Sequence, residues 1–217
     1  MKKDIKQLTE QFSGRKTILL PESTNSDCYA VYSKEEYKKN VSKNLIIDGK
    51  AYKHRLYYYK KLNNKSKNIL TFIILNPGTT NHLKEDSTVK NCIKIANKKY
   101  GAIEIFSIFT LRTTIKINAV LENAILNITR TDLSKNDIVL AYGDKLKYTS
   151  NISRENLTKI NKVRDIKVNE LLNFIFNQPN RKGKIYTVGL TKSKNPKTLT
   201  HIKNTKLIEV KLSDLNY

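Results

Sequence analysis

A nearly continuous apolar segment, residues 69–75 (ILTFIIL), ends abruptly at Asn76-Pro77-Gly78. A short apolar run bounded by turn residues is typical of a strand that is buried on both faces of a sheet. This pattern restricts the fold to one in which a sheet lies inside the molecule. Three further segments of this kind are 103–109, 137–142 and 185–190. Residues 207–212 predict a fifth strand.

Helical segments separate these strands. Residues 88–100 place Val89, Cys92, Ile93 and Ala96 on one helical face, which predicts an amphipathic helix. Strands that alternate with helices predict a mainly parallel α/β sheet covered by helices on both faces, and ligands bind such sheets beyond the carboxyl ends of the strands. The further predicted helices are 117–126 and 154–177, and the loops at the carboxyl ends are 76–88, 110–114, 143–147 and 191–198.

The N-terminal part of the chain lacks this alternation. Residues 3–13 predict a short helix, and residues 16–32 predict a strand and a loop. Ser33 and Glu36 have the spacing of a capping box, which predicts a second short helix over 34–40. We therefore expect a small extension with the order helix, strand or loop, helix.

A hairpin follows the extension. Asp48-Gly49 lies between the apolar residues 45–47 and 51–52, and this dipeptide is a strong hairpin signal. The second arm, from Tyr52 to Lys60, is rich in tyrosine and suits a strand. We place the boundary here, with an N-terminal extension of residues 1–48 packed on a main domain of residues 49–217.

Several protein classes are not indicated by the sequence. No apolar run reaches the ~18 residues of a membrane span, and the N-terminus lacks the apolar core of a secretory signal. Cys28 and Cys92 are isolated thiols, which favours a reduced, cytoplasmic protein. The histidines, His54, His82 and His201, form no metal motif, and no glycine-rich phosphate loop, nucleophile elbow or CxxC pair is present. We expect neither a cofactor nor a metal.

The net charge of +22 points to a polyanionic partner. DNA, RNA, an acidic protein or a membrane surface would each satisfy this charge. The 41 basic residues comprise 34 lysines and 7 arginines, and arginine is the better sign of selected phosphate or base contacts. A bias toward A/T-rich codons is therefore the competing explanation for the lysines.

The first loop offers a candidate for water activation. Asn76 directly follows a buried strand, so its amide can accept a hydrogen bond from a water molecule and orient it. Pro77, Gly78 and Thr79 complete the loop, and Asp86 or Ser87 can cap the helix that follows. An ordinary strand-to-helix turn uses the same residue types and is the competing interpretation.

The other three loops offer candidates for anion binding. Arg112 follows a buried strand, so we expect its charge to emerge at the end of the sheet, where it binds phosphate or pairs with an acid such as Asp86. Gly143 ends the third buried strand. A solvated basic loop is the competing interpretation for the fourth loop. The candidate binding residues of that loop are Thr191, Lys192, Lys194 and Lys197.

The tyrosines 57–59 lie between His54-Arg55 and Lys60-Lys61. Aromatic side chains interleaved with bases can form a stacking surface for single-stranded nucleic acid. A strand that packs alternate tyrosines into the core has the same pattern. We favour the core interpretation.

Short stretches occur in a fixed order along the chain: 52–56, 75–80, 85–88, 107–114, 141–143, and 190–192 running to 196–197. They resemble the pattern of a bacterial family, domain-of-unknown-function family 1643: a YRY-like strand, LNPSTA, DDPT, NLFAYRAT, AWG, and a late LG-T-K-G-P-RHPLY segment. The resemblance covers about residues 50–204, which is most of the chain.

That family in turn resembles the uracil-DNA glycosylase superfamily. The resemblance implies a small, mainly parallel four-stranded sheet flanked by helices on both faces. In the mismatch-specific branch the first loop reads N-P-G, which Asn76-Pro77-Gly78 matches. Asn76 would then position water against C1′ of a flipped nucleotide, and the late loop would grip the DNA backbone and stabilise the departing base.

The late loop departs from the superfamily. The superfamily has H-P-S there and the unknown family has H-P-L-Y, whereas the aligned residues here are Thr198-Leu199-Thr200, with His201 as the nearest histidine. Loss of one donor to the departing base typically costs ~10²–10³ in rate. Arg112 and Lys192 remain as electrostatic substitutes for this donor. Because the histidine itself is missing, efficient uracil excision is not expected.

Four functional hypotheses follow, in this order. The first is a nucleic-acid-binding protein, for single- or double-stranded DNA, with weak or no uracil excision. The second is an active glycosylase in which Asn76 orients water. The third is a basic module that binds an acidic, DNA-mimicking inhibitor protein. The fourth is a protein whose charge reflects genome composition and whose loops bind a small anion. If Arg112 lies at the site, Arg112→Ala weakens ligand binding more than loss of a scattered surface lysine.

Overall fold

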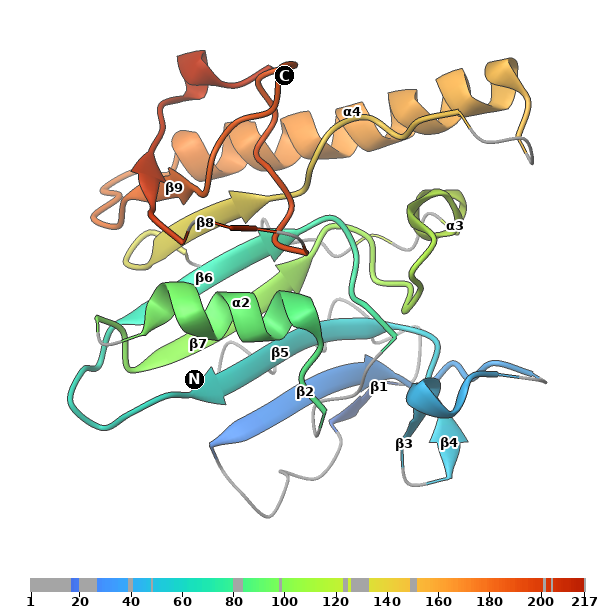
Figure 1. The fold of residues 1–217 in the computed structure, drawn as a ribbon, viewed down its shortest axis with the longest axis horizontal. Coiled ribbons are helices and arrows are strands. Elements are labelled where there is room, and N and C mark those ends of the chain that lie inside the picture. The colour runs from blue at the N-terminus through green and yellow to red at the C-terminus, as the bar shows by residue number, and fades with distance from the viewer. Residues whose placement is uncertain are drawn as a thin grey trace.

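The protein folds around one mixed β-sheet with helices on both faces (Figure 1). The structure is a computed structural model. It describes residues 17–19, 27–38, 41–47, 49–79, 84–97, 99–122, 125, 133–148, 152–200, 202–203 and 205–216. The main sheet has eight strands in the order β1-β2-β5-β7-β6-β8-β9-β10. These strands are β1 (Thr17–Leu19), β2 (Cys28–Ser33), β5 (Arg55–Lys61), β6 (Ile69–Ile74), β7 (Ala102–Ser107), β8 (Asp137–Ala141), β9 (Ile185–Thr187) and β10 (Ile208–Glu209).

Four neighbouring strands of this sheet, β7, β6, β8 and β9, are parallel. They are the four buried strands that the apolar segments predict. The fifth predicted strand, over 207–212, is present only as the two-residue strand β10, and both of its residues are exposed. On one side β1, β2 and β5 extend the sheet, each antiparallel to its neighbour, and β10 is antiparallel to β9 on the other side. The predicted α/β class is therefore confirmed, but the prediction of a mainly parallel sheet is wrong, because four of the seven strand pairings of the main sheet are antiparallel. The predicted size of the sheet is wrong, because the tyrosine-rich strand β5 pairs with the free edge of β7 and brings β2 and β1 with it.

The helices cover opposite faces because the order of the parallel strands reverses at β6. The chain adds β7 on one side of β6 and then β8 and β9 on the other side. Helix α2 (Ser87–Ala96) connects β6 to β7 and packs on one face, whereas α3 (Lys116–Leu121) and α4 (Arg154–Phe176) follow β7 and β8 and pack on the other (Figure 1). The side chains of β6 alternate between the two cores: Phe72 faces α2, and Ile73 faces α3 and α4. The three helices predicted between the strands are confirmed, although α2 ends at Ala96 rather than at 100 and α3 ends at Leu121 rather than at 126. No helix in the described part of the chain is both long and apolar enough to cross a membrane.

The described part of segment 1–48 is built into the main sheet through β1 and β2. The helix predicted over 34–40 is absent from its described residues, 34–38, because Glu36 instead forms a β-bridge with Tyr52. The helix predicted over 3–13 lies outside the described residues. Short 3₁₀ turns occupy Lys43–Leu45 and Leu212–Asp214.

The predicted hairpin is present as a separate small sheet, β3 (Ile46–Ile47) and β4 (Lys50–Ala51). Its second arm does not continue to residue 60 as predicted, because β5 begins at Arg55 and belongs to the main sheet. Tyr57, Tyr58 and Tyr59 on β5 are all buried. The core interpretation of these tyrosines is therefore confirmed.

Candidate ligand-binding cleft

Two adjoining cavities lie over the carboxyl ends of the parallel strands, where the four loops meet. The first, here called the hydroxyl pocket, has a volume of about 240 Å³. It is lined by Ile74, Leu75, Asn76, Gly78, Thr79, Asp86, Ser87, Thr88, Thr113, Thr114, Lys116, Ala141, Thr198, Leu199 and Thr200. The second, here called the lysine cavity, has a volume of about 720 Å³. It is lined by Lys116, Gly143, Asp144, Lys145, Leu146, Lys147, Val188, Thr191, Lys197, Thr198, Ile202 and Lys203.

The two cavities share Lys116 and Thr198, so they form one cleft. This position agrees with the general rule that α/β sheets bind ligands where strand connections leave in opposite directions. The chain leaves β6 toward α2 on one face and leaves β7 and β8 toward α3 and α4 on the other. The cleft opens where these connections leave toward opposite faces of the sheet.

The amide of Asn76 is held in one orientation in the hydroxyl pocket. Its Nδ2 donates to the backbone oxygens of Thr113, at 2.8 Å, and Pro77, at 3.0 Å. Because carbonyl oxygens only accept hydrogen bonds, both contacts require nitrogen at that end of the amide. The acceptor Oδ1 remains for a ligand or a water molecule, and no described residue donates to it.

The first loop packs closely against the start of α2. Asp86 caps this helix, as predicted, by accepting from the backbone N–H of Val89 at 2.9 Å. A Cβ on Gly78 would lie 2.6 Å from Oδ2 of Asp86, so the backbone approaches the carboxylate too closely for a side chain. Because residue 78 is glycine, Asp86 can cap α2 and at the same time lie against the first loop.

Arg112 is fully buried and lines neither cavity. Its guanidinium donates to the backbone oxygens of Thr79 (2.8 Å), Leu45 (2.9 Å) and Tyr52 (3.0 Å), and it lies over the ring of Tyr32. Burial lowers the pKa of Arg112 to about 10, so the group stays charged near neutral pH. The prediction that its charge emerges at the end of the sheet is wrong, because Arg112 turns inward and ties the first loop to the N-terminal segment.

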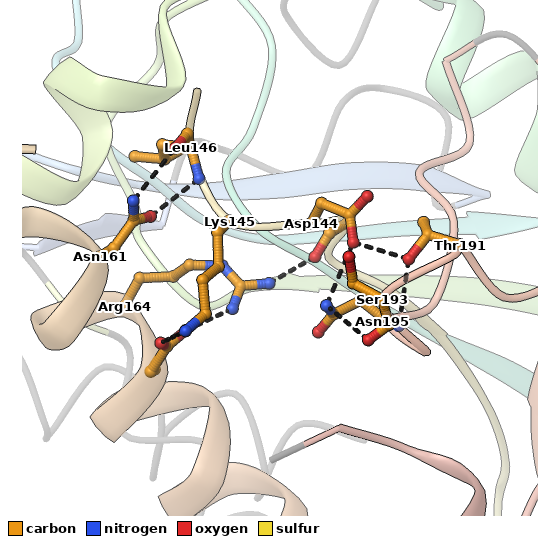
Figure 2. Close-up of polar contacts among 10 residues, drawn as sticks. Asp144, Lys145, Leu146, Asn161, Arg164, Thr191, Ser193 and Asn195 are labelled. Carbon is orange, nitrogen blue, oxygen red and sulfur yellow. Dashed lines mark hydrogen bonds and ion pairs between the residues drawn. The ribbon is translucent and has the colours of Figure 1, made fainter. Parts of the chain in front are cut away.

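The third and fourth loops are joined through Asp144. Its Oδ1 accepts from the hydroxyl of Thr191 at 2.6 Å and from the amide of Asn195 at 3.1 Å (Figure 2). Gly143 precedes it with φ +78°, a conformation that favours glycine, and a Cβ there would lie 2.6 Å from a methyl carbon of Thr198. The two loops therefore form one wall of the lysine cavity.

Helix α4 supports this wall from beneath. Arg164, which is buried, donates to the backbone oxygen of Gly143 and lies over the ring of Tyr142. The amide of Asn161 binds Leu146 twice, accepting from its N–H at 2.8 Å and donating to its C=O at 3.0 Å (Figure 2). Sequence reasoning missed Arg164 and Asn161, because they carry no local signal within a long charged helix.

The candidate residues of the fourth loop separate into two groups. Lys197 and Thr191 line the lysine cavity, whereas Lys192 and Lys194 are exposed and line neither cavity. Four further lysines that sequence reasoning did not single out line the lysine cavity: Lys116, Lys145, Lys147 and Lys203. Five lysines and one aspartate thus line this cavity, and only Lys145 among these lysines forms an ion pair, with Asp165, within the described part of the chain. The excess of positive charge favours an anionic ligand.

The residues aligned with the superfamily's histidine motif also reach the cleft. Thr198, Leu199 and Thr200 all line the hydroxyl pocket, and the backbone oxygen of Leu199 accepts from the amide of Asn91 at 2.6 Å. Two hydroxyl groups therefore lie in the segment where a histidine is expected. His201 lies outside the described residues.

A separate cluster of possible metal ligands comprises Glu35, His54 and Glu122, whose ligand atoms lie within 4.8 Å of one another. The ammonium of Lys53 already binds Glu35 at 2.9 Å and Glu122 at 2.6 Å. The two glutamates raise the pKa of Lys53 against the opposing effect of burial. A cation of the protein itself thus occupies the position between the carboxylates.

The chain belongs to the family described as "Protein of unknown function (DUF1643)", whose family model matches residues 55–198. The resemblance found in the sequence is therefore confirmed for this family. The match begins with β5 and ends in the hydroxyl pocket at Thr198, so it includes all four loops of the cleft. No curated protein and no solved structure gives a significant match to the chain.

Proposed function

We propose that this chain is a nucleic-acid-binding protein with a uracil-DNA glycosylase-like fold and with weak or no uracil excision. The lysine cavity takes backbone phosphates of DNA, and the hydroxyl pocket takes part of one nucleotide. The observation that carries this proposal is the set of five lysines around a single aspartate at the carboxyl ends of the parallel strands. Neutralisation of phosphates by lysine supplies most of non-specific DNA affinity.

The hydroxyl pocket supports a nucleotide rather than a bare anion. Hydroxyl groups from seven residues border it, and each can donate and accept a hydrogen bond. A sugar or a base edge offers matching donors and acceptors, whereas an inorganic anion offers only acceptors. The seven residues are Thr79, Ser87, Thr88, Thr113, Thr114, Thr198 and Thr200.

The fixed amide of Asn76 favours the second candidate function, an active glycosylase. Its two backbone contacts leave Oδ1 to orient water in the pocket. A threonine hydroxyl at position 198 or 200 is a weaker donor to a departing base than a charged or polarised imidazole. We therefore expect excision, if measured, to be ~10²–10³ slower than with an intact histidine donor.

The test is a titration of the full chain onto labelled single-stranded and duplex oligonucleotides, with and without uracil, at two salt concentrations. We expect binding that weakens steeply with salt, and no alkali-sensitive site at uracil. Cleavage at uracil that disappears in Asn76→Ala would replace the binding proposal with the glycosylase. Absence of DNA binding, combined with salt-dependent binding to an acidic DNA-mimic protein, would replace it with the inhibitor-binding module.

The chain offers a matched control for the position of the site. Lys147→Gln/Lys203→Gln removes two charges from the lysine cavity, and Lys192→Gln/Lys194→Gln removes two exposed charges outside it. We expect the first pair to weaken binding about tenfold or more and to reduce the salt slope by about 2, and the second pair to change affinity by less than about threefold. Equal effects of the two pairs would contradict binding in this cavity.

A further inference from the structure

Lys116 is the lysine that borders both cavities. It is the first residue of α3, and the loop before it carries Thr113, whose backbone oxygen fixes the amide of Asn76. No hydrogen bond or ion pair joins the ammonium of Lys116 to any residue that the structure describes. Its amine is therefore available to a ligand that extends from one cavity into the other.

The surroundings of Lys116 favour the neutral amine. Its Nζ lies 3.8 Å from the position that a Cβ on Gly143 would take, and the buried guanidinium of Arg164 binds the oxygen of Gly143. Burial first, and then the positive charge of Arg164, lower the pKa of Lys116, while Asp144 opposes the shift. Asp144 makes no ion pair with Lys116, and its Oδ1 accepts from Thr191 and Asn195.

The other lysines of the cleft are placed differently. Lys145 forms an ion pair with Asp165 at 2.8 Å. Lys147, Lys197 and Lys203 line the lysine cavity but not the hydroxyl pocket, and their positive charges suit a phosphate group. A lysine amine becomes a nucleophile toward carbonyl carbon when partial burial or a neighbouring cation lowers its pKa. Both effects act on Lys116, although the residue as a whole stays exposed to solvent.

We propose that Lys116 forms an imine with the aldehyde of a phosphorylated sugar, held with its phosphate in the lysine cavity and its sugar toward the hydroxyl pocket. This inference rests on the proposed function, because the ring-opened abasic deoxyribose of DNA is such an aldehyde. The amine nitrogen adds to the aldehyde carbon, and the aldehyde oxygen leaves as water with the two protons of the amine. One C=N bond replaces one C=O bond, and no oxidant or reductant takes part.

The test uses the full chain and an oligonucleotide with one aldehydic abasic site, with cyanoborohydride to reduce any imine to a stable amine. We expect a covalent adduct of one protein to one oligonucleotide, and peptide mapping that places it on Lys116. Lys116→Arg keeps the positive charge but lacks the nucleophilic amine, so we expect at least tenfold less adduct. Lys192→Arg makes the same change at an exposed lysine that lines neither cavity, so it is the matched control and keeps the adduct.

Two further arms separate the possible failures. An oligonucleotide with a tetrahydrofuran site has no aldehyde, so its affinity measures DNA binding alone, and we expect Lys116→Arg to bind it within about threefold of the parent chain. In the second arm, deoxyribose 5-phosphate is the only carbonyl compound, which tests whether the aldehyde can come from a free sugar phosphate. An adduct on Lys116 with this sugar but not with DNA would support the imine and would show that abasic DNA is not its substrate. Tight binding of the tetrahydrofuran site without adduct from either carbonyl, or undiminished adduct in Lys116→Arg, overturns the inference and leaves the proposed function intact.

Discussion

The cleft has two walls, one formed by the first loop and one formed by the third and fourth loops. Each wall is held by one buried arginine, but the two arginines bind different groups. Arg112 gives its guanidinium to three backbone oxygens, two of which, on Leu45 and Tyr52, precede the family match. Arg164 binds one backbone oxygen, on Gly143, and the carboxylate of Asp165 at 2.7 Å, all within the match. The wall formed by the third and fourth loops is thus complete within the family region, whereas the first loop depends on this chain's N-terminal segment.

The largest effect is expected from Arg112→Met. Removal of the guanidinium leaves buried carbonyl oxygens without donors, and each such group costs about 1–3 kcal/mol. We expect the free energy of unfolding, measured with urea, to fall by about 3–5 kcal/mol and ligand binding to fall more than in Lys192→Ala. Arg112→Lys is the control, and it should recover only part of the loss because an ammonium cannot reach three carbonyls in one plane. A loss below about 1 kcal/mol would contradict the conclusion that Arg112 joins the first loop to the N-terminal segment.

Arg164→Met should cost less stability but disturb the lysine cavity directly. It removes one carbonyl contact and an ion pair whose acid is partly exposed, so we expect a loss of about 2–3 kcal/mol in the same urea measurement. Asp165→Asn keeps the arginine and should cost less than about 1 kcal/mol, because partly exposed pairs contribute little. If the two substitutions cost the same, the ion pair rather than the support of Gly143 explains the role of Arg164.

The two glycines with φ +78° separate backbone strain from steric fit. Gly49→Ala introduces a Cβ into open space, whereas Gly143→Ala places it 2.6 Å from a methyl carbon of Thr198. We expect Gly49→Ala to cost about 1 kcal/mol and Gly143→Ala about 2–3 kcal/mol, with weaker DNA binding for Gly143→Ala alone. Thermal unfolding and the oligonucleotide titration check both values. Recovery by Thr198→Ser in the Gly143→Ala background would locate the clash, and its absence would count against it.

The smallest effect is expected from Asn161→Asp on α4. The carboxylate keeps the acceptor for the N–H of Leu146 but loses the donor to its C=O, so we expect a loss of about 1–2 kcal/mol. Asn173→Asp makes the same charge change at an exposed position of the same helix and should stay within about 0.5 kcal/mol. Chemical denaturation measures the free energy of unfolding of both variants. Equal decreases would show that the added negative charge, and not the lost contact to Leu146, explains the result.

Local patterns in the sequence were enough to predict the central strands, the three helices and the loops at the carboxyl ends. Apolar runs and helical periodicity arise from neighbouring residues. They identified β6 and α4 almost to their observed bounds, and they identified α2 with an end four residues too late. The same reasoning placed Asn76 and Gly143 at the cleft, because a residue that follows a buried strand lies at the edge of the sheet. The Asp86 cap was predictable for the same local reason.

Only the tertiary structure decided which strands pair and which charged side chains reach the cleft. Strand β5 could extend the sheet or remain in its hairpin, and pairing with β7 is a contact between residues far apart in the chain. Arg112 turns inward because the backbone oxygens of Leu45, Tyr52 and Thr79 accept its hydrogen bonds. Lys116, the first residue of α3, borders both cavities because α3 packs against α4. Side-chain direction depends on such distant neighbours, which is why residue type and spacing predicted the loops of this site but assigned the wrong arginine to it.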